Sequence, residues 1–305
     1  RGNQLVQIGG TFNSLVGTVT PMLVGALIGS VTAETQIADV NTVLFIAMGV
    51  FALTYLILSF VPFVEPEQET SDATIKGLLK YKHLVYGVIA IFLYVGVEIG
   101  IPGTLNFYLT DTLGTANAAT TAGFVAGTYW FLMLVGRLVG GSIAGKVSSK
   151  TMLSCVSVIG LCLVLAAIFT SPETKVMMPV FQSDISFGML SVPANIMFLV
   201  LCGLCTSVMW GGIFNLAVEG LGIGVHCDLG GGLLAVEGLG KFTAAASGIF
   251  MVMVCGGGIL PAIQGFVADA TSYMTSYWVI VAGLGYLLFY ALVGSKNVNK
   301  DIPVE

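Results

Sequence analysis

The sequence predicts an all-α polytopic membrane protein, a helical bundle with about eight transmembrane helices. The composition is one reason, because 56% of the 305 residues are hydrophobic and 9% are charged, with a mean hydropathy of +0.97. Soluble domains carry about 25% charged residues, so this chain could not cover a surface that faces water. The other two reasons are apolar stretches long enough to cross a bilayer and basic residues that gather in alternate breaks between them.

The apolar stretches justify the predicted helices one by one. A spanning helix needs about 20 apolar residues, whereas the strands of a β-barrel would be about half as long and would alternate polar with apolar residues. An even number of spans puts both chain ends on one side of the membrane. The predicted spans are residues 8–30, 42–64, 84–108, 121–145, 151–171, 193–216, 243–266 and 276–294.

The sorting of charge predicts the orientation. Ten of the 11 Lys and Arg residues precede the first span, occupy every second break or follow the last span, and Lys175 is the exception. Basic residues concentrate in cytoplasmic loops, so we expect both visible ends in the cytoplasm and residues 172–192 outside. No basic stripe suggests a nucleic-acid partner. The ten residues are Arg1, Lys76, Lys80, Lys82, Arg137, Lys146, Lys150, Lys241, Lys296 and Lys300.

The main hydrophilic connector, residues 65–83, divides the chain into two spans before it and six after it. The connector itself is predicted to be cytoplasmic, as is a tail at residues 296–305.

Neither the cysteines nor an internal repeat points to a metal. The six cysteines mostly lie inside apolar stretches, where they serve as small packing residues. Residues 217–222 recur at 235–240, around His226, Cys227 and Asp228. Three adjacent side chains cannot easily wrap one ion, so we expect a local duplication or an inserted loop.

Glu98 is the clearest candidate for a functional charge, because charges inside a bilayer are costly. It lies deep in the span 84–108 and is expected to be the only deeply placed titratable group. Tyr94, Pro102 and Asn106 recur with it at four-residue spacing, so these residues share one helix face. We interpret this face as lining a water-filled cavity. The alternative is a buried Glu98 that is protonated and bonded to a neighbour.

A second polar face lies in the span 193–216. Ser207, Asn215 and Glu219 share it at multiples of four residues, beside Trp210. Amides hydrogen bond hydroxyl groups and an aromatic ring packs on the apolar face of a pyranose, so this face suits a sugar. The alternatives are a core or interface role for Trp210 and a capping or gating role for Glu219.

Spans at both ends of the chain add amides and a bend. Asn13 lies in the first span, and Gln264 lies in the seventh, after Gly256–Gly258 and a proline. A glycine-rich break followed by proline inside a membrane marks a helix that bends, as transporter helices do. Small residues four apart, such as Gly96 and Gly100, let helices approach closely.

Arg137 lies at the cytoplasmic end of the span 121–145, between Gly136 and Gly140. An Arg there can pair with carbonyls at a helix end or with a nearby carboxylate, which would hold a gate shut. The alternative is a topology anchor, and the two roles are compatible.

Five motifs along the chain, taken together, resemble one transporter family. They are Arg1–Gln4 with Gly10–Ser14, Phe92–Glu98, Tyr129-Trp130 with Gly136-Arg137, Met209–Ala217, and Gly257–Gly265. They resemble the major facilitator superfamily, specifically its fucose:proton symporter family, which includes the bacterial glucose/galactose transporters. The resemblance covers nearly the whole chain.

The resemblance implies twelve helices in two six-helix bundles joined by a cytoplasmic loop, to which the connector 65–83 is similar. Residues 1–64 would then supply the last two helices of the first bundle, and residues 84–295 would form the six-helix second bundle. The spans would then be helices five to twelve, and the chain, which has no initiating Met, is expected to lack the first four and not to transport alone. The family's acidic residues in helices one and four therefore have no counterpart here. In the family a segment like 217–222 runs straight into one like 241–244, so the 18 residues 223–240 are extra, and either Glu219 or Glu237 takes the family position.

Resemblance and polar faces together predict a secondary active transporter that takes up a hexose such as fucose, glucose or galactose with protons, by alternating access, in a bacterial inner membrane. We expect a non-enzyme, a monomer, and no cofactor or metal beyond the proton gradient; its partners are the sugar and lipid. Drug or solute export and a non-transporting scaffold are the alternatives. The candidate substrate contacts are Asn13, Tyr94, Glu98, Asn106, Trp210, Asn215 and Gln264, with Glu98 for proton coupling and Arg137 and Glu219 for gating.

Overall fold

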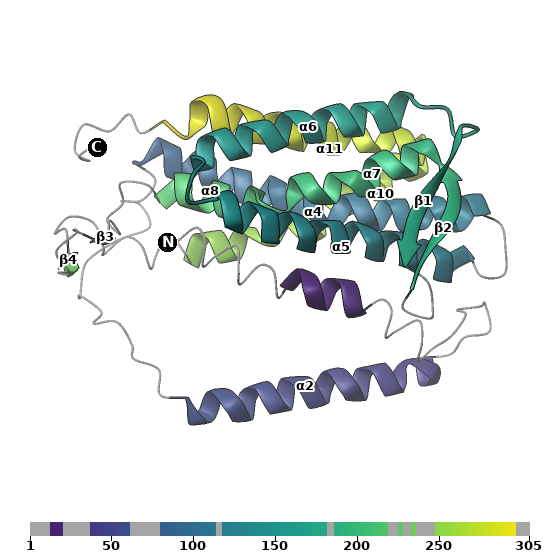
Figure 1. Ribbon diagram of the computed structural model, residues 1–305, viewed down its shortest axis with the longest axis horizontal. Coiled ribbons are helices and arrows are strands. Elements are labelled where there is room, and N and C mark those ends of the chain that lie inside the picture. Colours follow the sequence, from purple (N-terminus) through teal and green to yellow (C-terminus); the bar gives the residue numbers. More distant parts are fainter. Residues whose placement is uncertain are drawn as a thin grey trace.

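The chain folds into a helical bundle with a β-hairpin across one end, seen here in a computed structural model (Figure 1). The structure describes residues 13–20, 37–61, 80–113, 118–181, 186–218, 225–227, 233–235 and 248–296. Within these residues, 7 helices are long and apolar enough to cross a membrane. The predicted helical membrane architecture is confirmed, and the chain is a multi-pass membrane protein.

Three long helices begin the bundle. α4 covers Lys82–Leu113, α5 covers Ala118–Ile143 and α6 covers Ser149–Phe169. α4 stays helical through a proline in its interior, which removes one backbone hydrogen bond. α6 begins where the Ser148 hydroxyl accepts the Thr151 N–H at 3.1 Å. Such a side-chain cap satisfies one of the N–H groups that a helix start leaves free.

The next span is divided in two. α7 covers Ala194–Thr206 and α8 covers Met209–Val218, and the turn residues Ser207 and Val208 separate them. Together they form one apolar stretch, Ala194–Ala217, that is long enough to cross the membrane. Because the break falls within this stretch, it frees backbone groups from helical hydrogen bonding inside the membrane.

The last two spans complete the bundle. α10 covers Gly256–Ala270 and follows a helical segment at 248–253. α11 covers Tyr273–Phe289 and runs into η2, a π-helical turn at Tyr290–Gly294. A turn separates residue 253 from α10, directly before the glycines for which the sequence predicts a bend.

α4 is the central helix of the bundle. It packs against α5, α7, α8, α10 and α11, and Ile101 and Leu105 on it are fully buried. On the outside of the bundle large apolar side chains stay exposed, among them Leu138, Phe169 and Phe266. Such an exterior suits contact with lipid, which is as apolar as these side chains.

α2 lies apart from this bundle in Figure 1. It covers Asn41–Phe60, follows the short 3-10 helix η1 (Ile37–Val40), and has no buried residue. The helical residues 13–20 lie closer, because a Cβ on Gly17 would be 3.4 Å from Cε3 of Trp130 in α5.

Seven of the eight predicted spans coincide with described helices over most of their length. The first predicted span is described only at residues 13–20, and the connector 65–83 only from residue 80. The division of the chain into two bundles at that connector stays a prediction.

Residues 172–192, predicted as a loop, contain an antiparallel hairpin instead. β1 covers Lys175–Phe181 and β2 covers Phe187–Pro193. The hairpin packs on α5 and α7 through buried residues that include Met178 and Val180. Burial of every second residue is the period of a strand, and a search for apolar stretches of about 20 residues does not detect it.

A second strand pair follows the first copy of the internal repeat and ends on the first residue of the second copy. β3 covers Val225–Cys227 and β4 covers Leu233–Ala235, and they pair antiparallel. The flanking residues, including Glu219 and Glu237, lie outside the described residues. The predictions of an inserted loop and of a gating glutamate there stay predictions.

Candidate functional site

Two opposite charges meet inside the bundle. Arg137 Nη2, from α5, donates to Glu98 Oε1, from α4, at 3.1 Å. Both residues are buried, with exposed fractions of 5% for Arg137 and 9% for Glu98. Glu98 is therefore not the only charged side chain inside the bundle, and its role in proton coupling stays a prediction. Among the described residues the Glu98 carboxyl group is buried and bonded to a neighbour, which is the geometry of the alternative interpretation.

Arg137 also holds the break between α7 and α8. Its Nε donates to the Ser207 carbonyl at 3.3 Å. Gly136 and Gly140 permit this approach, because a Cβ on them would collide with Ser207 and Val208 respectively. The prediction that Arg137 lies in a break between spans is wrong, since it lies within α5 and its side chain is buried between helices. The prediction that it pairs with a helix-end carbonyl or a carboxylate is confirmed, because it does both.

Hydroxyl groups tie the surrounding helices together. The Tyr129 hydroxyl, from α5, donates to the Glu98 backbone carbonyl at 3.2 Å and hydrogen bonds with the Thr206 hydroxyl at 3.0 Å. The Tyr94 hydroxyl, from α4, donates to the Thr206 carbonyl at 3.2 Å. Buried hydrogen bonds of this kind are strong because the local dielectric constant is low. Tyr94, Tyr129 and Thr206 thus form a hydrogen-bonded layer that fixes the helices around the charge pair.

Trp210 and Asn215, two predicted substrate contacts, lie on α8 beside this layer. The Trp210 ring meets the Tyr94 ring edge to face, with centroids 6.1 Å apart. The Asn215 Nδ2 is buried without a hydrogen-bond partner among the described residues. A buried donor left unpaired costs about 1–3 kcal/mol, a cost that a bound hydroxyl or carbonyl oxygen would remove.

Gln264, another predicted contact, lies across α4 from the charge pair. It is fully buried on α10, and neither of its amide atoms has a partner within the described part of the chain. A Cβ on Gly100 would be 2.6 Å from its Oε1, and one on Gly96 would collide with Leu260. The prediction that the Gly96–Gly100 pair allows close helix contact is confirmed.

Asn106 and Asn13 are placed differently from the other candidates. Asn106 is half-buried on α4, where the Thr110 hydroxyl donates to its backbone carbonyl at 2.8 Å. Asn13 is exposed at the start of the helical residues 13–20. Their contact with a substrate stays a prediction.

Thr206 carries no feature in the sequence that would select it. It hydrogen bonds with Tyr129 through its hydroxyl and with Tyr94 through its carbonyl, because α7 ends there. Tyr129 belongs to one of the family-like motifs, but its partners come from other helices and appear only in the fold. Among the described residues no group of three His, Cys, Asp or Glu residues is arranged to hold a metal ion.

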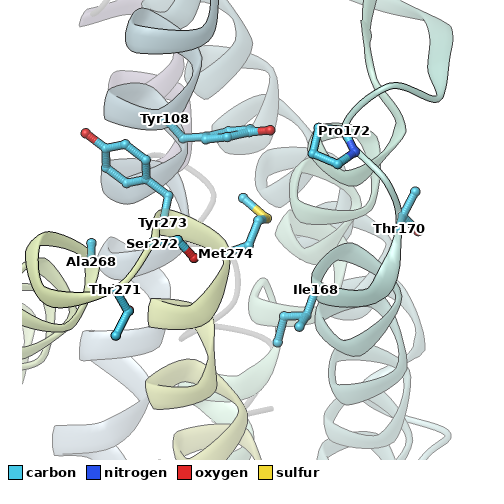
Figure 2. A pocket seen from close by; sticks show the side chains of 9 residues that line it. All are labelled: Tyr108, Ile168, Thr170, Pro172, Ala268, Thr271, Ser272, Tyr273 and Met274. Carbon is cyan, nitrogen blue, oxygen red and sulfur yellow. The ribbon is translucent and has the colours of Figure 1, made fainter.

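A pocket of about 540 Å³ opens at the end of the bundle opposite the Lys146–Lys150 turn (Figure 2). α4 contributes Tyr108, and the end of α6 contributes Ile168 and Thr170. The turn from α10 into α11 contributes residues 271–274. None of the residues predicted as substrate contacts lines this pocket.

Comparison with known proteins finds relatives that share most of this chain, although no protein-family model matches it. A protein named glucose/galactose transporter from Brucella abortus is 28% identical over 293 residues, which are 94% of this chain and 62% of that protein. A putative glucose/galactose transporter of Helicobacter pylori is 27% identical over 307 residues, 95% of this chain and 65% of that one. This chain thus spans less than two thirds of the length of these relatives.

A more distant relative and two solved structures agree with them. The L-fucose-proton symporter of Escherichia coli is 21% identical over 218 residues, 72% of this chain and 41% of the symporter. A crystal structure of a variant of that fucose:proton symporter has a TM-score of 0.67 at 17% identity, covering 97% of this chain and 69% of the other. A second, of a major facilitator superfamily transporter in the outward conformation, has a TM-score of 0.66. These matches confirm the resemblance that the motifs predict.

Proposed function

We propose, because this chain has the major facilitator fold and resembles the glucose/galactose transporters and the fucose-proton symporter, that it serves the proton-coupled uptake of a hexose. Alternating access between two bundles would move the sugar past a site near the middle of the membrane. The substrate is a hexose such as fucose, glucose or galactose, and the proton gradient supplies the energy without a further cofactor.

The buried ion pair between Glu98 and Arg137 carries this proposal. Well-packed apolar residues would stabilise a bundle as well as a buried ion pair does. Charges inside a membrane are expensive and mark ion and substrate pathways. A pair at 3.1 Å within the transporter fold is therefore better explained by coupling than by stability.

Arg137 gives proton binding a mechanical consequence. It bonds to the Glu98 carboxylate and to the Ser207 carbonyl at the break between α7 and α8. A proton on Glu98 cancels the carboxylate charge and weakens the first of these bonds, while the guanidinium keeps its own charge. The balance at the break then shifts toward Ser207, so protonation and the bend of this span are coupled.

The sugar would bind beside this pair. Trp210 offers a partly exposed ring for the apolar face of a pyranose, and Asn215 offers a buried N–H without a partner in the described part of the chain. Asn13 and Gln264 would add amides from the helical residues 13–20 and from α10. Glu219 would act as a gate next to α8.

The same proposal includes the setting of the protein. It places the chain in a bacterial inner membrane as a monomer with both visible ends in the cytoplasm. Residues 1–64 would belong to one bundle, 65–83 to the loop between bundles, 84–295 to the other bundle and 296–305 to the tail. The sorting of basic residues along the sequence supports this orientation.

Replacement of Glu98 by Gln in the protein as its genome encodes it tests the proposal. The amide keeps the shape of the side chain, but it neither ionises nor takes up and releases a proton. We expect galactose accumulation driven by an imposed pH gradient to fall at least tenfold in membrane vesicles. Glu173→Gln, which changes an exposed acid in the turn after α6, should leave accumulation unchanged. Wild-type accumulation with Glu98→Gln would remove Glu98 from the mechanism.

A further inference from the structure

We propose that the pocket between α4, α6, α10 and α11 is an outer binding site for the sugar, which it holds before the sugar reaches the middle of the membrane (Figure 2). This inference rests on the proposed function for its ligand. The site is separate from the Glu98–Arg137 cluster, because none of its lining residues belongs to that cluster.

Size and place suit a hexose. Ligand pockets have volumes of about 300–1,000 Å³, and this pocket has about 540 Å³. It lies at the end of the bundle opposite the Lys146–Lys150 turn, which the charge pattern predicts to be cytoplasmic. A sugar arriving from outside would therefore meet this pocket before the deeper site.

A buried amide holds two walls of the pocket in place. Asn195 is fully buried at the start of α7. Its Nδ2 donates to the Tyr108 hydroxyl at 3.3 Å and to the Met274 sulfur at 3.5 Å, while its Oδ1 accepts the Ile196 N–H at 2.9 Å. Burying an amide is costly unless it is hydrogen bonded. Here both side-chain partners line the pocket, so the amide fixes the pocket's shape.

Tyr108 presents a ring and a donor to the pocket. Because Asn195 donates to its oxygen, Tyr108 keeps its own proton for another acceptor. Figure 2 shows the Tyr108 ring edge-on, with its hydroxyl directed toward Pro172. The Tyr273 ring supports it with centroids 5.9 Å apart, and the Tyr273 hydroxyl points away to Asp111 Oδ2, at 2.6 Å. A flat aromatic wall with one donor suits the mixed faces of a pyranose.

Two threonine hydroxyls of the pocket act as acceptors. Thr170 donates its proton to the Ala166 carbonyl, and Thr271 donates to the Val267 carbonyl, each at 2.6 Å. Their oxygens therefore offer lone pairs to a ligand. A sugar has many O–H groups to satisfy them, whereas an apolar solute would leave them unpaired, which is costly when they lose water. This favours a sugar over an apolar solute.

Tryptophan fluorescence gives separate signals for the two sites. Trp278 lies one turn after Met274 on α11, and its ring meets Phe169 with centroids 6.3 Å apart. Trp210 lies in the deeper site. Because the chain has three tryptophans, replacing two of them by Phe leaves a single reporter for either site.

D-galactose is titrated onto each single-tryptophan protein in lipid nanodiscs, with D-mannitol as the control for osmotic effects. We expect a saturable change at Trp278 with galactose and none with mannitol. Ala268→Phe fills the pocket without removing a hydrogen bond and should weaken the Trp278 response at least tenfold, while the Trp210 response stays unchanged. Ala270→Phe, on the same helix but outside the pocket, should change neither response.

Two kinds of result would overturn the outer site. One concerns the Trp278 fluorescence: galactose does not change it, mannitol changes it as galactose does, or the response to galactose is as strong in Ala268→Phe as in the unmodified pocket. The other is a saturable change in Trp278 fluorescence with hexanol and none with galactose, which would make the pocket an apolar site. Either outcome leaves the proposed function to the Trp210 titration and the Glu98→Gln uptake assay, so the two failures can be told apart.

Discussion

The two faces of α4 are built in opposite ways. The face toward α5, α7 and α8 carries Glu98 and Tyr94, and their polar groups are bonded to Arg137 and Thr206. The face toward α10 carries Gly96 and Gly100, which Leu260 and Gln264 approach closely, and the amide of Gln264 has no partner among the described residues. One interface is joined by directional bonds, whereas the other is joined by close packing.

This difference indicates which helix interface of the bundle is fixed and which one can slide. Breaking the bonded face leaves a buried charge unpaired, so that face resists rearrangement. Among the described residues the glycine face has no such bonds to break, and backbone and aliphatic groups pack without a fixed direction. We therefore expect α10 to move along α4 more easily than α5 does, and the following substitutions test that contrast.

Arg137→Ala should have the largest effect, because it leaves the Glu98 carboxylate buried without its cation. The free energy of unfolding should fall by about 3–5 kcal/mol, as measured by denaturant unfolding in mixed micelles. Adding Glu98→Gln to Arg137→Ala should recover part of this loss, since the unpaired charge is then absent. If Arg137→Ala alone unfolds like the unmodified protein, the bonded face is not the fixed one.

Gly256→Ala should have the next largest effect. A Cβ at this position would collide with the backbone carbonyl of Phe92 in α4, which cannot turn aside as a side chain can. Overpacking of this kind costs about 1–3 kcal/mol, and thermal unfolding in lipid would show it. Gly258→Ala is the matched control, because a Cβ there would have nothing within 4 Å. Equal shifts for the two variants would mean that α10 does not pack this closely on α4.

Removal of polar atoms should change the free energy of unfolding in opposite directions on the two faces of α4. Gln264→Met deletes a buried amide without a described partner and should raise the free energy of unfolding by about 1–2 kcal/mol. Tyr129→Phe deletes hydrogen bonds to Glu98 and Thr206 and should lower it by about 1 kcal/mol. The same unfolding assay compares them. Loss of stability with Gln264→Met would show that the amide has a structural partner, which argues against its being held for a sugar.

Local sequence determined the number and place of most helices. Residues 84–108 and 151–171 are long and apolar, and an apolar stretch of that length can satisfy its backbone groups in lipid only as a helix. Glu98 could be selected for the same reason, because a charge stands out against an apolar helix whatever its neighbours are. The hairpin at 175–193 was not predictable in this way, because its alternation of buried and exposed residues depends on packing over α5 and α7.

Only the tertiary structure decided which side chains are in contact. Arg137 is 39 positions from Glu98, and Ser207 is 70 positions from Arg137. No local pattern connects residues so far apart, because their contact depends on which helix faces pack together and on where α7 ends. Asn195 is the same case, an ordinary residue in the sequence whose bonds reach Tyr108 and Met274. A short-range pattern can specify a helix and its solvent, but a site requires the packing that brings distant side chains within hydrogen-bonding distance.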